Sequence, residues 1–361
     1  MIKSLSEIAQ VTMGQSPKSE FYNSNNNGLP FLQGRTTFGD KYPTFDTWTT
    51  SWNKEAFSGD ILFTVRAPVG DLNIANCKIA IGRGLAAIHP TNVNNKYLYY
   101  LLLSNKSKFV NTSSGTIFDS INKNALESIK LNVHDSTIQN HIVNTIGSVD
   151  DLIENYNKRI NKICDILSKS LEKYQDTTSI SYYEPTIIKS GINSFDIEKI
   201  YLDTSSIEGV NKISSGEIIT IDHRPSRANM QPIANTVWFA KMKGSNKNLI
   251  ITKNDKDIIN GHILSTGFMG IEASKNLPLS LLSAFVISNN FNIQRDLNSV
   301  GTTMAGINNE TFKEITVPLL NNQEVEEFDK RYSKYIDELS LLRRKIKKLE
   351  KVKELLLNKY F

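Results

Sequence analysis

The most constraining feature of this chain is an internal repeat with an offset of 186 residues. At this offset Gly115-Thr116 falls on Gly301-Thr302, and Ile121-Asn122 falls on Ile307-Asn308. Internal repetition limits the possible architectures, because each copy is expected to fold as the same kind of unit. The repeat predicts a globular unit followed by a long helix, made twice.

Each copy ends in an apolar seam with alternating spacings of four and three residues. This spacing averages roughly 3.5 residues per turn, the period of coiled coils, and predicts two long helices that pack on one another. The seam residues of the first copy are Ile142, Ile146, Val149, Ile153, Tyr156, Ile160, Ile163 and Leu167, and those of the second are Phe328, Tyr332, Tyr335, Leu339, Leu342, Ile346 and Leu349. The second seam breaks at Lys353.

The short connection between the copies predicts the direction of the helices. The first helix ends near Tyr174, and a polar link leads directly into the second globular unit, so the second helix must run back. The predicted fold is α+β, with two globular units separated by an antiparallel coiled coil and related by approximate two-fold symmetry. The alternative is that each helix packs only on its own globular unit. The predicted boundaries are a first globular domain over 1–134, a first helix over 135–178, a second globular domain over 179–320 and a second helix over 321–361.

The composition is that of an ordinary globular chain, with 39% hydrophobic and 22% charged residues. The start of the chain lacks the charged-then-apolar layout of a signal peptide, and no apolar stretch is long enough to span a bilayer. We therefore expect a cytoplasmic protein without membrane contact. Cys77 and Cys164 form no metal-binding pattern, and we expect both to be inert.

The net charge of +5 is concentrated near one end of the sequence. Residues 341–361 carry a strong excess of Lys and Arg, so the remainder of the chain is slightly acidic. Two interpretations stay open for this basic run: a solvated helix face, or a stripe that faces phosphate groups.

The sequence contains no recognisable catalytic motif. It has no Gly-rich phosphate loop ending in Lys-Ser or Lys-Thr, and no Asn-Pro-Pro-Tyr motif of amino-methyltransferases. Gly82-Arg83-Gly84 lacks the third glycine of a dinucleotide fingerprint, and the five histidines form no cluster. We expect no enzymatic activity, cofactor or metal in this chain, whose function is then to bind.

Several glycine-rich turns follow strand-like runs in the first unit. The runs are Leu29–Leu32, Gly59–Arg66 and Ala80–Ile88. Two interpretations of the glycines stay open: they bring backbone close to a ligand, or they permit positive φ angles.

These runs, with the following Ser-Gly-Thr and heptad helix, resemble the specificity subunit of type I restriction-modification systems. The similarity is carried by Leu-Pro-Phe-Leu-Gln-Gly, Gly-Asp-Ile-Leu-Phe-Thr-Val-Arg-Ala-Pro-Val-Gly-Asp-Leu and Ile-Gly-Arg-Gly-Leu-Ala-Ala-Ile. The second copy matches less well: Gly261–Gly270 is placed opposite Gly59–Gly70, and no Gly-Arg-Gly follows it.

The resemblance implies a non-catalytic DNA-recognition subunit for DNA methylation and phage defence. Each globular unit, or target-recognition domain, would read one half of a bipartite double-stranded DNA target, and the helices would set the unread spacer. The subunit would position two adenine methyltransferase subunits, which bind S-adenosylmethionine, and through them the restriction subunits with translocase and nuclease activity. Two alternatives are a protein-protein scaffold built on a coiled-coil rod and an enzyme that acts alone.

The candidate DNA-binding residues are polar or basic groups in the predicted loops, because such groups contact base edges and phosphates. Arg66 and Arg83 have an alternative role as buried structural arginines. In the first unit the candidates are Gln33, Arg35, Thr36, Thr37, Arg66, Arg83, Ser113, Ser114 and Thr116; in the second they are Arg224, Arg227, Lys241, Lys243, Lys247 and Thr302.

Overall fold

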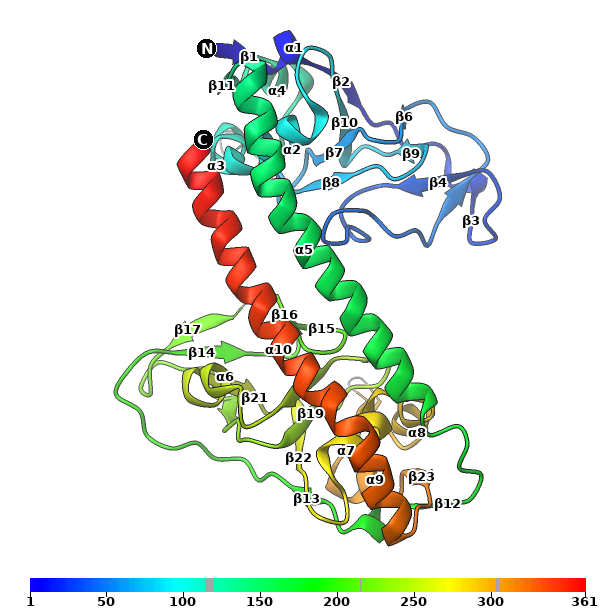
Figure 1. Ribbon diagram of the computed structural model, residues 1–361. Helices are drawn as coiled ribbons and strands as arrows, with labels where there is room; N and C mark the ends of the chain where they lie inside the picture. Colours follow the sequence, from blue (N-terminus) through cyan, green and yellow to red (C-terminus); the bar gives the residue numbers. More distant parts are fainter. Residues whose placement is uncertain (114–119, 215, 303–304) are drawn as a thin grey trace. The chain divides into compact units, whose positions relative to one another are not determined.

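The computed structural model describes residues 1–113, 120–214, 216–302 and 305–361, which divide into two compact units. Unit 1 comprises residues 1–151 and 351–361, and unit 2 comprises residues 152–350 (Figure 1). Each of the two long helices, α5 (Ser136–Lys169) and α10 (Asn322–Tyr360), contributes one part to unit 1 and one part to unit 2. Among the described residues, no helix has the length and apolar content needed to cross a bilayer.

Unit 1 contains an antiparallel four-stranded sheet, a mixed five-stranded sheet and a short two-stranded one. The first has the order β2 (Ala9–Met13), β10 (Leu85–Pro90), β7 (Ile61–Thr64), β8 (Leu72–Ile74). The second has the order β3 (Tyr22–Asn23), β5 (Trp48–Thr49), β4 (Leu29–Leu32), β9 (Ile79–Ile81), β6 (Glu55–Ala56), and β4 and β9 are parallel. The third pairs β1 (Ile2–Ser4) with β11 (Lys130–Asn132). The shorter helices are α1 (Leu5–Ile8), η1 (Ser19–Phe21), α2 (Asn95–Ser104), α3 (Lys106–Ser113) and α4 (Lys123–Ser128).

Unit 2 contains two four-stranded sheets and two short two-stranded pairs. One four-stranded sheet has the order β13 (Thr186–Ile187), β22 (Phe268–Glu272), β19 (Thr236–Ala240), β20 (Asn248–Ile251). The other has the order β17 (Glu217–Ile219), β14 (Lys199–Leu202), β21 (His262–Ser265), β18 (Ala228–Met230), and β14 and β21 are parallel. Two-stranded pairs are β12 (Thr177–Ser179) with β23 (Thr316–Pro318) and β15 (Ile207–Glu208) with β16 (Lys212–Ile213). The helices are η2 (Ile180–Tyr183), α6 (Lys256–Gly261), α7 (Leu279–Ile287), α8 (Asn289–Leu297) and α9 (Asn309–Lys313).

The predicted repeat is present in the strand order and in the core. Sheet β2-β10-β7-β8 and sheet β13-β22-β19-β20 have the same chain order and the same antiparallel pairings. In unit 1 the rings of Phe63 and Phe109 meet edge to face at 5.0 Å, and in unit 2 those of Phe239 and Phe291 do so at 5.1 Å. The two halves are therefore copies of one α+β fold.

The placement of Gly261–Gly270 opposite Gly59–Gly70 is wrong. The strand order makes β19 the counterpart of β7, and β21 with β22 the counterparts of β9 with β10. Gly267 therefore corresponds to Gly84. The offset between the copies is not constant, because connections of different length separate the equivalent strands: it is 176 residues from Val65 to Lys241 and 183 from Gly84 to Gly267. The pairing of Gly261–Gly270 with Gly59–Gly70 needs an offset of 202 at its first glycine and matches glycines of different strands.

The antiparallel direction of the helices is confirmed within each unit. In unit 1 the Asp150 carboxylate pairs with Lys353 Nζ at 2.7 Å, and the Tyr360 hydroxyl lies 3.0 Å from His141 Nε2. In unit 2 Arg159 pairs with Glu338, and Lys345 lies over the Tyr156 ring. In both units the α5 numbering rises as the α10 numbering falls, as an antiparallel pair requires.

The helices also pack on the globular part of their units. Ile142 and Ile146 belong to the unit 1 core, and Ile163 and Leu339 belong to the unit 2 core that contains α7. The structure thus combines helix pairing with the alternative of packing on each unit. Of the predicted seam, Ile142, Ile146, Val149, Ile160, Ile163, Leu167, Phe328, Tyr332, Leu339 and Leu342 are buried, and Ile153, Tyr156, Tyr335, Ile346 and Leu349 are half-buried.

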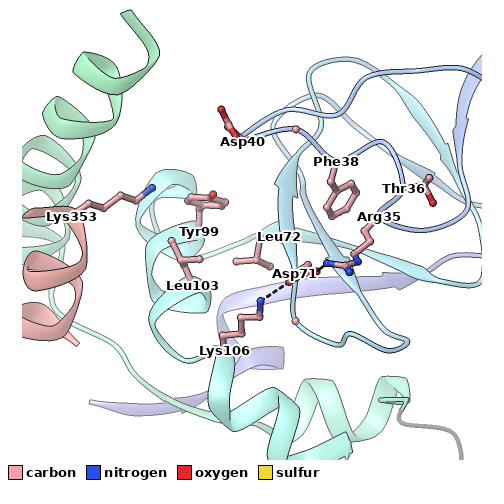
Figure 2. A pocket seen from close by; sticks show the side chains of 12 residues that line it. Arg35, Thr36, Phe38, Asp40, Asp71, Leu72, Tyr99, Leu103, Lys106 and Lys353 are labelled. Atoms are coloured by element: carbon pink, nitrogen blue, oxygen red, sulfur yellow. Dashed lines mark hydrogen bonds and ion pairs between the residues drawn. The ribbon is translucent and has the colours of Figure 1, made fainter. Parts of the chain in front are cut away.

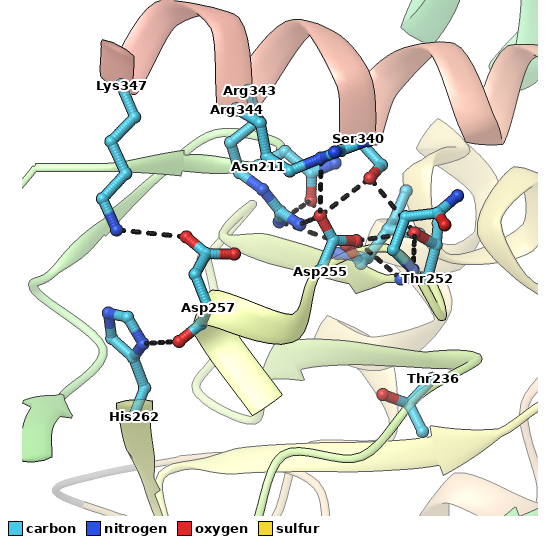
Figure 3. Close-up of polar contacts among 12 residues, drawn as sticks. Asn211, Thr236, Thr252, Asp255, Asp257, His262, Ser340, Arg343, Arg344 and Lys347 are labelled. Atoms are coloured by element: carbon cyan, nitrogen blue, oxygen red, sulfur yellow. Dashed lines mark hydrogen bonds and ion pairs between the residues drawn. The ribbon is translucent and has the colours of Figure 1, made fainter. Parts of the chain in front are cut away.

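A buried polar network connects α10 to the globular part of unit 2 (Figure 3). The Asp255 carboxylate is fully buried and lies 2.7 Å from both the Arg343 guanidinium and the Ser340 hydroxyl. It also accepts a hydrogen bond from the Thr252 N–H at 2.8 Å. Burial acts to raise the pKa of Asp255, but the charge of Arg343 and these hydrogen bonds outweigh it and lower the pKa below its usual value.

The network accounts for part of the basic run on α10. Arg343 and Arg344 both pair with Asp255, Lys347 pairs with Asp257, and Lys353 pairs with Asp150. These cations neutralise carboxylates of their own units. Neither of the two interpretations of the basic run anticipates this role, which leaves fewer of its charges available for phosphate.

The first prediction concerns the buried face of α10. Leu339 is fully buried, whereas its neighbour Leu341 is 41% exposed. Leu339→Asp should lower the free energy of unfolding by about 3 kcal/mol or more, because it leaves a cavity and buries an unpaired carboxylate. Leu341→Asp should change it by less than about 0.5 kcal/mol. Urea unfolding followed by circular dichroism measures both. Equal effects would contradict the assignment of the buried face.

The second prediction concerns the Asp255 network. Arg343→Met should destabilise the chain by about 3–5 kcal/mol, because it leaves a buried carboxylate unpaired. Lys347→Met removes only an exposed pair and should cost less than about 1 kcal/mol. Because the folded-state pKa of Asp255 is lowered, its contribution is present at neutral pH and is lost as the pH falls below about 4. Urea unfolding between pH 7 and pH 3 should therefore show a weaker acid loss in Asp255→Asn than in the parent.

Candidate nucleic-acid interface

In unit 1 three of the predicted DNA-binding residues surround Gly84. The Gly84 N–H donates to the Gln33 carbonyl at 3.1 Å, and the Gly84 carbonyl accepts from the Val65 N–H at 3.0 Å. The side chains of Gln33, Arg66 and Arg83 therefore start from adjacent backbone positions, and all three residues are exposed. A Cβ atom at Gly84 would lie 2.3 Å from the Gln33 carbonyl oxygen. This glycine is needed so that two protein backbones approach, which is neither of the roles considered from the sequence.

Arg66 and Arg83 are exposed, so their alternative role as buried structural arginines is wrong. Within the described part of the chain, neither guanidinium has a hydrogen bond or ion pair. Arg66 forms an isolated antiparallel bridge with Ser120. Among the described residues, the site thus presents two cations without a carboxylate partner, held at the ends of paired strands.

Arg35 and Thr36 lie instead on a pocket of about 740 Å³ (Figure 2). The Asp71 carboxylate in this pocket pairs with Arg35 at 2.7 Å and with Lys106 at 2.5 Å. Lys353 also lines the pocket and pairs with Asp150. Each of these three cations already has a carboxylate partner, so the pocket does not offer a strong anion site.

The remaining candidates of unit 1 are less informative. Thr37 is half-buried, and its carbonyl accepts a hydrogen bond from the Thr44 N–H. Ser113 is the last residue of α3, and its side chain lies outside what the structure describes. Ser114 and Thr116 lie outside the described residues.

Unit 2 builds the equivalent framework around Gly267. The Lys241 N–H donates to the Gly267 carbonyl at 3.0 Å, as the Val65 N–H does to Gly84. The Arg227 carbonyl accepts a hydrogen bond from the Thr266 N–H at 2.9 Å. Arg227 and Lys241, both predicted from the sequence, are therefore brought to one place.

The charges of Arg227 and Lys241 interact unfavourably. Burial, and then the positive charge of Arg227, lower the pKa of Lys241. No carboxylate contributes to this pKa shift. Two neighbouring cations that have no acidic partner in the described ranges favour the binding of an anion, which would relieve their repulsion.

Of the other four candidates of unit 2, two have hydrogen-bonded side chains and two are exposed. Arg224 donates to the Ala228 carbonyl at 2.7 Å, and Lys247 Nζ donates to the Thr204 carbonyl at 2.7 Å. Both side chains are half-buried and stabilise loops. Lys243 and Thr302 are exposed.

The sequence did not predict a role for Arg295, whose side chain stabilises the turn after β19 in unit 2. Its side chain is 2% exposed, contacts the Ser245 carbonyl and pairs with Asp296 at 2.8 Å. Asp296 in turn accepts a hydrogen bond from the Gly244 N–H at 3.0 Å. This clamp fixes the turn after β19. A single arginine in an ordinary helical stretch gives no sequence signal for such a role.

The described residues offer no arrangement suited to metal or thiol chemistry. Across the described ranges, no group of three or more His, Cys, Asp or Glu side chains is arranged to hold a metal ion. Burial raises the pKa of the Cys77 thiol, and it raises that of Cys164 to about 12. Both thiols are therefore poor nucleophiles at neutral pH.

Comparisons with known proteins agree with the sequence motifs. Residues 1–165 match the family model described as the type I restriction modification DNA specificity domain. The chain is 43% identical over 147 residues to the MjaX type I restriction enzyme specificity subunit of Methanocaldococcus jannaschii, which covers 40% of this chain and 35% of that protein. It is 24% identical over 184 residues to the MjaIX specificity subunit of the same organism, covering 48% and 42%.

A solved structure matches over a longer range. The S subunit of a type I restriction-modification system from M. genitalium superposes with a TM-score of 0.53 at 15% identity, covering 100% of this chain and 96% of that one. This likeness concerns the fold. The matches to the curated relatives span less than half of their length. In residues 1–165 the chain carries the DNA specificity domain of type I restriction-modification systems, and it is related to their specificity subunits.

Proposed function

We propose that this chain is the DNA-recognition subunit of a type I restriction-modification complex and that each unit reads one half of a bipartite target. The observation that carries the proposal is the pair of equivalent frameworks around Gly84 and Gly267. Each framework presents cations that have no acidic partner among the described residues: Arg66 and Arg83 in unit 1, and Arg227 and Lys241 in unit 2. The match to the specificity domain covers only the first framework, and the shared strand order supports proposing the same role for the second.

The proposed division of labour follows from the chemistry of the side chains. Arg and Lys contacts to phosphate supply affinity and fix the register, and contacts to base edges supply specificity. The half-buried Lys241, together with Arg227, is suited to a phosphate. Arg66 and Arg83 are exposed and long enough to reach either a phosphate or a guanine edge.

The proposed partners carry the chemistry. Two adenine methyltransferase subunits, one for each half of the repeat, would bind S-adenosylmethionine, and restriction subunits would join through them. The two long helices are the proposed spacer between the half-sites and the docking surface for the methyltransferases. This role requires a cytoplasmic location with the DNA. A protein-protein scaffold is the competing function, and DNA binding separates the two.

The third prediction concerns phosphate contacts in unit 2. The complex should bind its target with an affinity that falls steeply with salt, because phosphate binding releases counterions. Arg227→Met and Lys241→Met should each reduce the slope of log affinity against log salt by about 1. Lys256→Met removes an exposed cation on α6 and serves as the matched control, with an unchanged slope. A chain that binds no DNA at low salt would favour the scaffold.

The fourth prediction concerns the independence of the two readers. Residues 1–134 are replaced by the corresponding segment of another specificity subunit, and methylated adenines are mapped in cells that also express the methyltransferase. One half of the methylated sequence should change, and the other half should remain. The reciprocal replacement of residues 179–320 should change only the other half. If either exchange alters both halves, the two units do not read separately.

A further inference from the structure

Arg66 and Met242 occupy equivalent positions in the two units. Each follows the residue that joins the strand framework: the Ile121 N–H donates to the Val65 carbonyl at 3.0 Å, and the Ile307 N–H donates to the Lys241 carbonyl at 3.1 Å. Arg66 bridges to Ser120, and Met242 bridges to Gly306, each bridge partner lying one residue before the donor. The two side chains therefore leave the same point of the same backbone arrangement.

The two side chains share exposure but differ in chemistry. Arg66 is exposed, and Met242 is 45% exposed. Val300, which is 52% exposed, exchanges two backbone hydrogen bonds with Gly306 on the other side of the Met242 bridge. Gly306 lies between Met242 and Val300 and has no side chain, so it covers neither of them. Unit 2 thus offers an apolar surface where unit 1 offers a guanidinium.

The neighbours of Met242 carry positive charge, since Lys241 precedes it and Lys243 follows it. Lys243 is exposed, and its N–H donates to the Ala305 carbonyl at 2.9 Å. An exposed apolar side chain between two lysines is poorly suited to another apolar protein surface, because the ammonium groups would have to be desolvated. Lys243 already has the Asp296 carboxylate nearby, so Lys241 is the cation that gains most from polyanionic DNA, which also offers an apolar group, the thymine methyl.

We propose that Met242, with Val300, contacts a thymine methyl in the half-site read by unit 2, whereas Arg66 contacts a guanine in the half-site read by unit 1. The guanidinium fork matches the O6 and N7 acceptors of guanine, and apolar side chains recognise the C5 methyl of thymine in the major groove. The inference rests on the proposed function and assigns the first base-reading pair within it.

The test uses the full chain with its methyltransferase subunit and synthetic duplexes that carry the mapped target. Each thymine of the second half-site is replaced in turn by deoxyuridine, which lacks only the methyl group. One replacement should weaken binding by the parent about fourfold, the value of one buried methyl group. Met242→Ala should bind the thymine and deoxyuridine duplexes equally. Leu297→Ala, which removes a 73% exposed apolar side chain of α8, should retain the parent's discrimination.

The guanine contact is tested in the same way. Replacing one guanine of the first half-site by 7-deazaguanine, which lacks the N7 acceptor, should weaken parent binding about fivefold or more. Arg66→Met should not distinguish the two duplexes. The inference is overturned if no deoxyuridine affects the parent, if the second half-site contains no thymine, or if Met242→Ala keeps the discrimination. A complex that methylates no bipartite sequence would instead overturn the proposed function itself.

Discussion

Each unit depends on one residue whose backbone joins three segments that are distant in sequence. In unit 1 this residue is Val65, which donates to Gly84 and accepts from Ile121; in unit 2 it is Lys241, which donates to Gly267 and accepts from Ile307. Because backbone groups make these bonds, the side chains of the joining residues and their neighbours are free to differ. A constant framework with variable side chains is what the proposed role in reading different sequences requires.

The contacts between α5 and α10 explain why α10 continues past Lys353, where its apolar seam ends. At the 186-residue offset, the pair equivalent to Asp150 and Lys353 is Ile336 and Leu167, and both of these belong to the unit 2 core. In unit 1 the apolar pair is replaced by an ion pair, with the Tyr100 hydroxyl donating to Asp150 at 2.7 Å. The lysine that interrupts the seam is thus matched by a carboxylate at the corresponding place. The interruption changes the kind of contact without ending the helix, which continues to Tyr360.

The sequence predicted the elements whose pattern is periodic or repeated. The long helices, their antiparallel direction and the duplicated α+β plan follow from the seam spacing and from the offset of 186 residues. Ile336, however, is buried beside the predicted seam residue Tyr335, because α10 packs on the globular part of unit 2 as well as on α5. A seam pattern that assumes one partner cannot anticipate a second. The sequence did not predict the Asp255 network either, because its members come from segments that are distant in sequence and share no repeated pattern.

The candidate site was less predictable, because the repeat is preserved in hydrogen bonds rather than in residue types. Arg83 and its counterpart Thr266 share no chemistry, and neither do Arg66 and Met242, so similarity in sequence between the copies fades at the framework although its backbone hydrogen bonds are kept. Matching by the pattern of glycines consequently paired Gly261–Gly270 with the wrong strand. The strand order recovers the correspondence, since each framework must close with the same backbone bonds whatever its loop lengths. Under the proposed function, divergent side chains on equivalent bonds are therefore the positions at which the two units would read different half-sites.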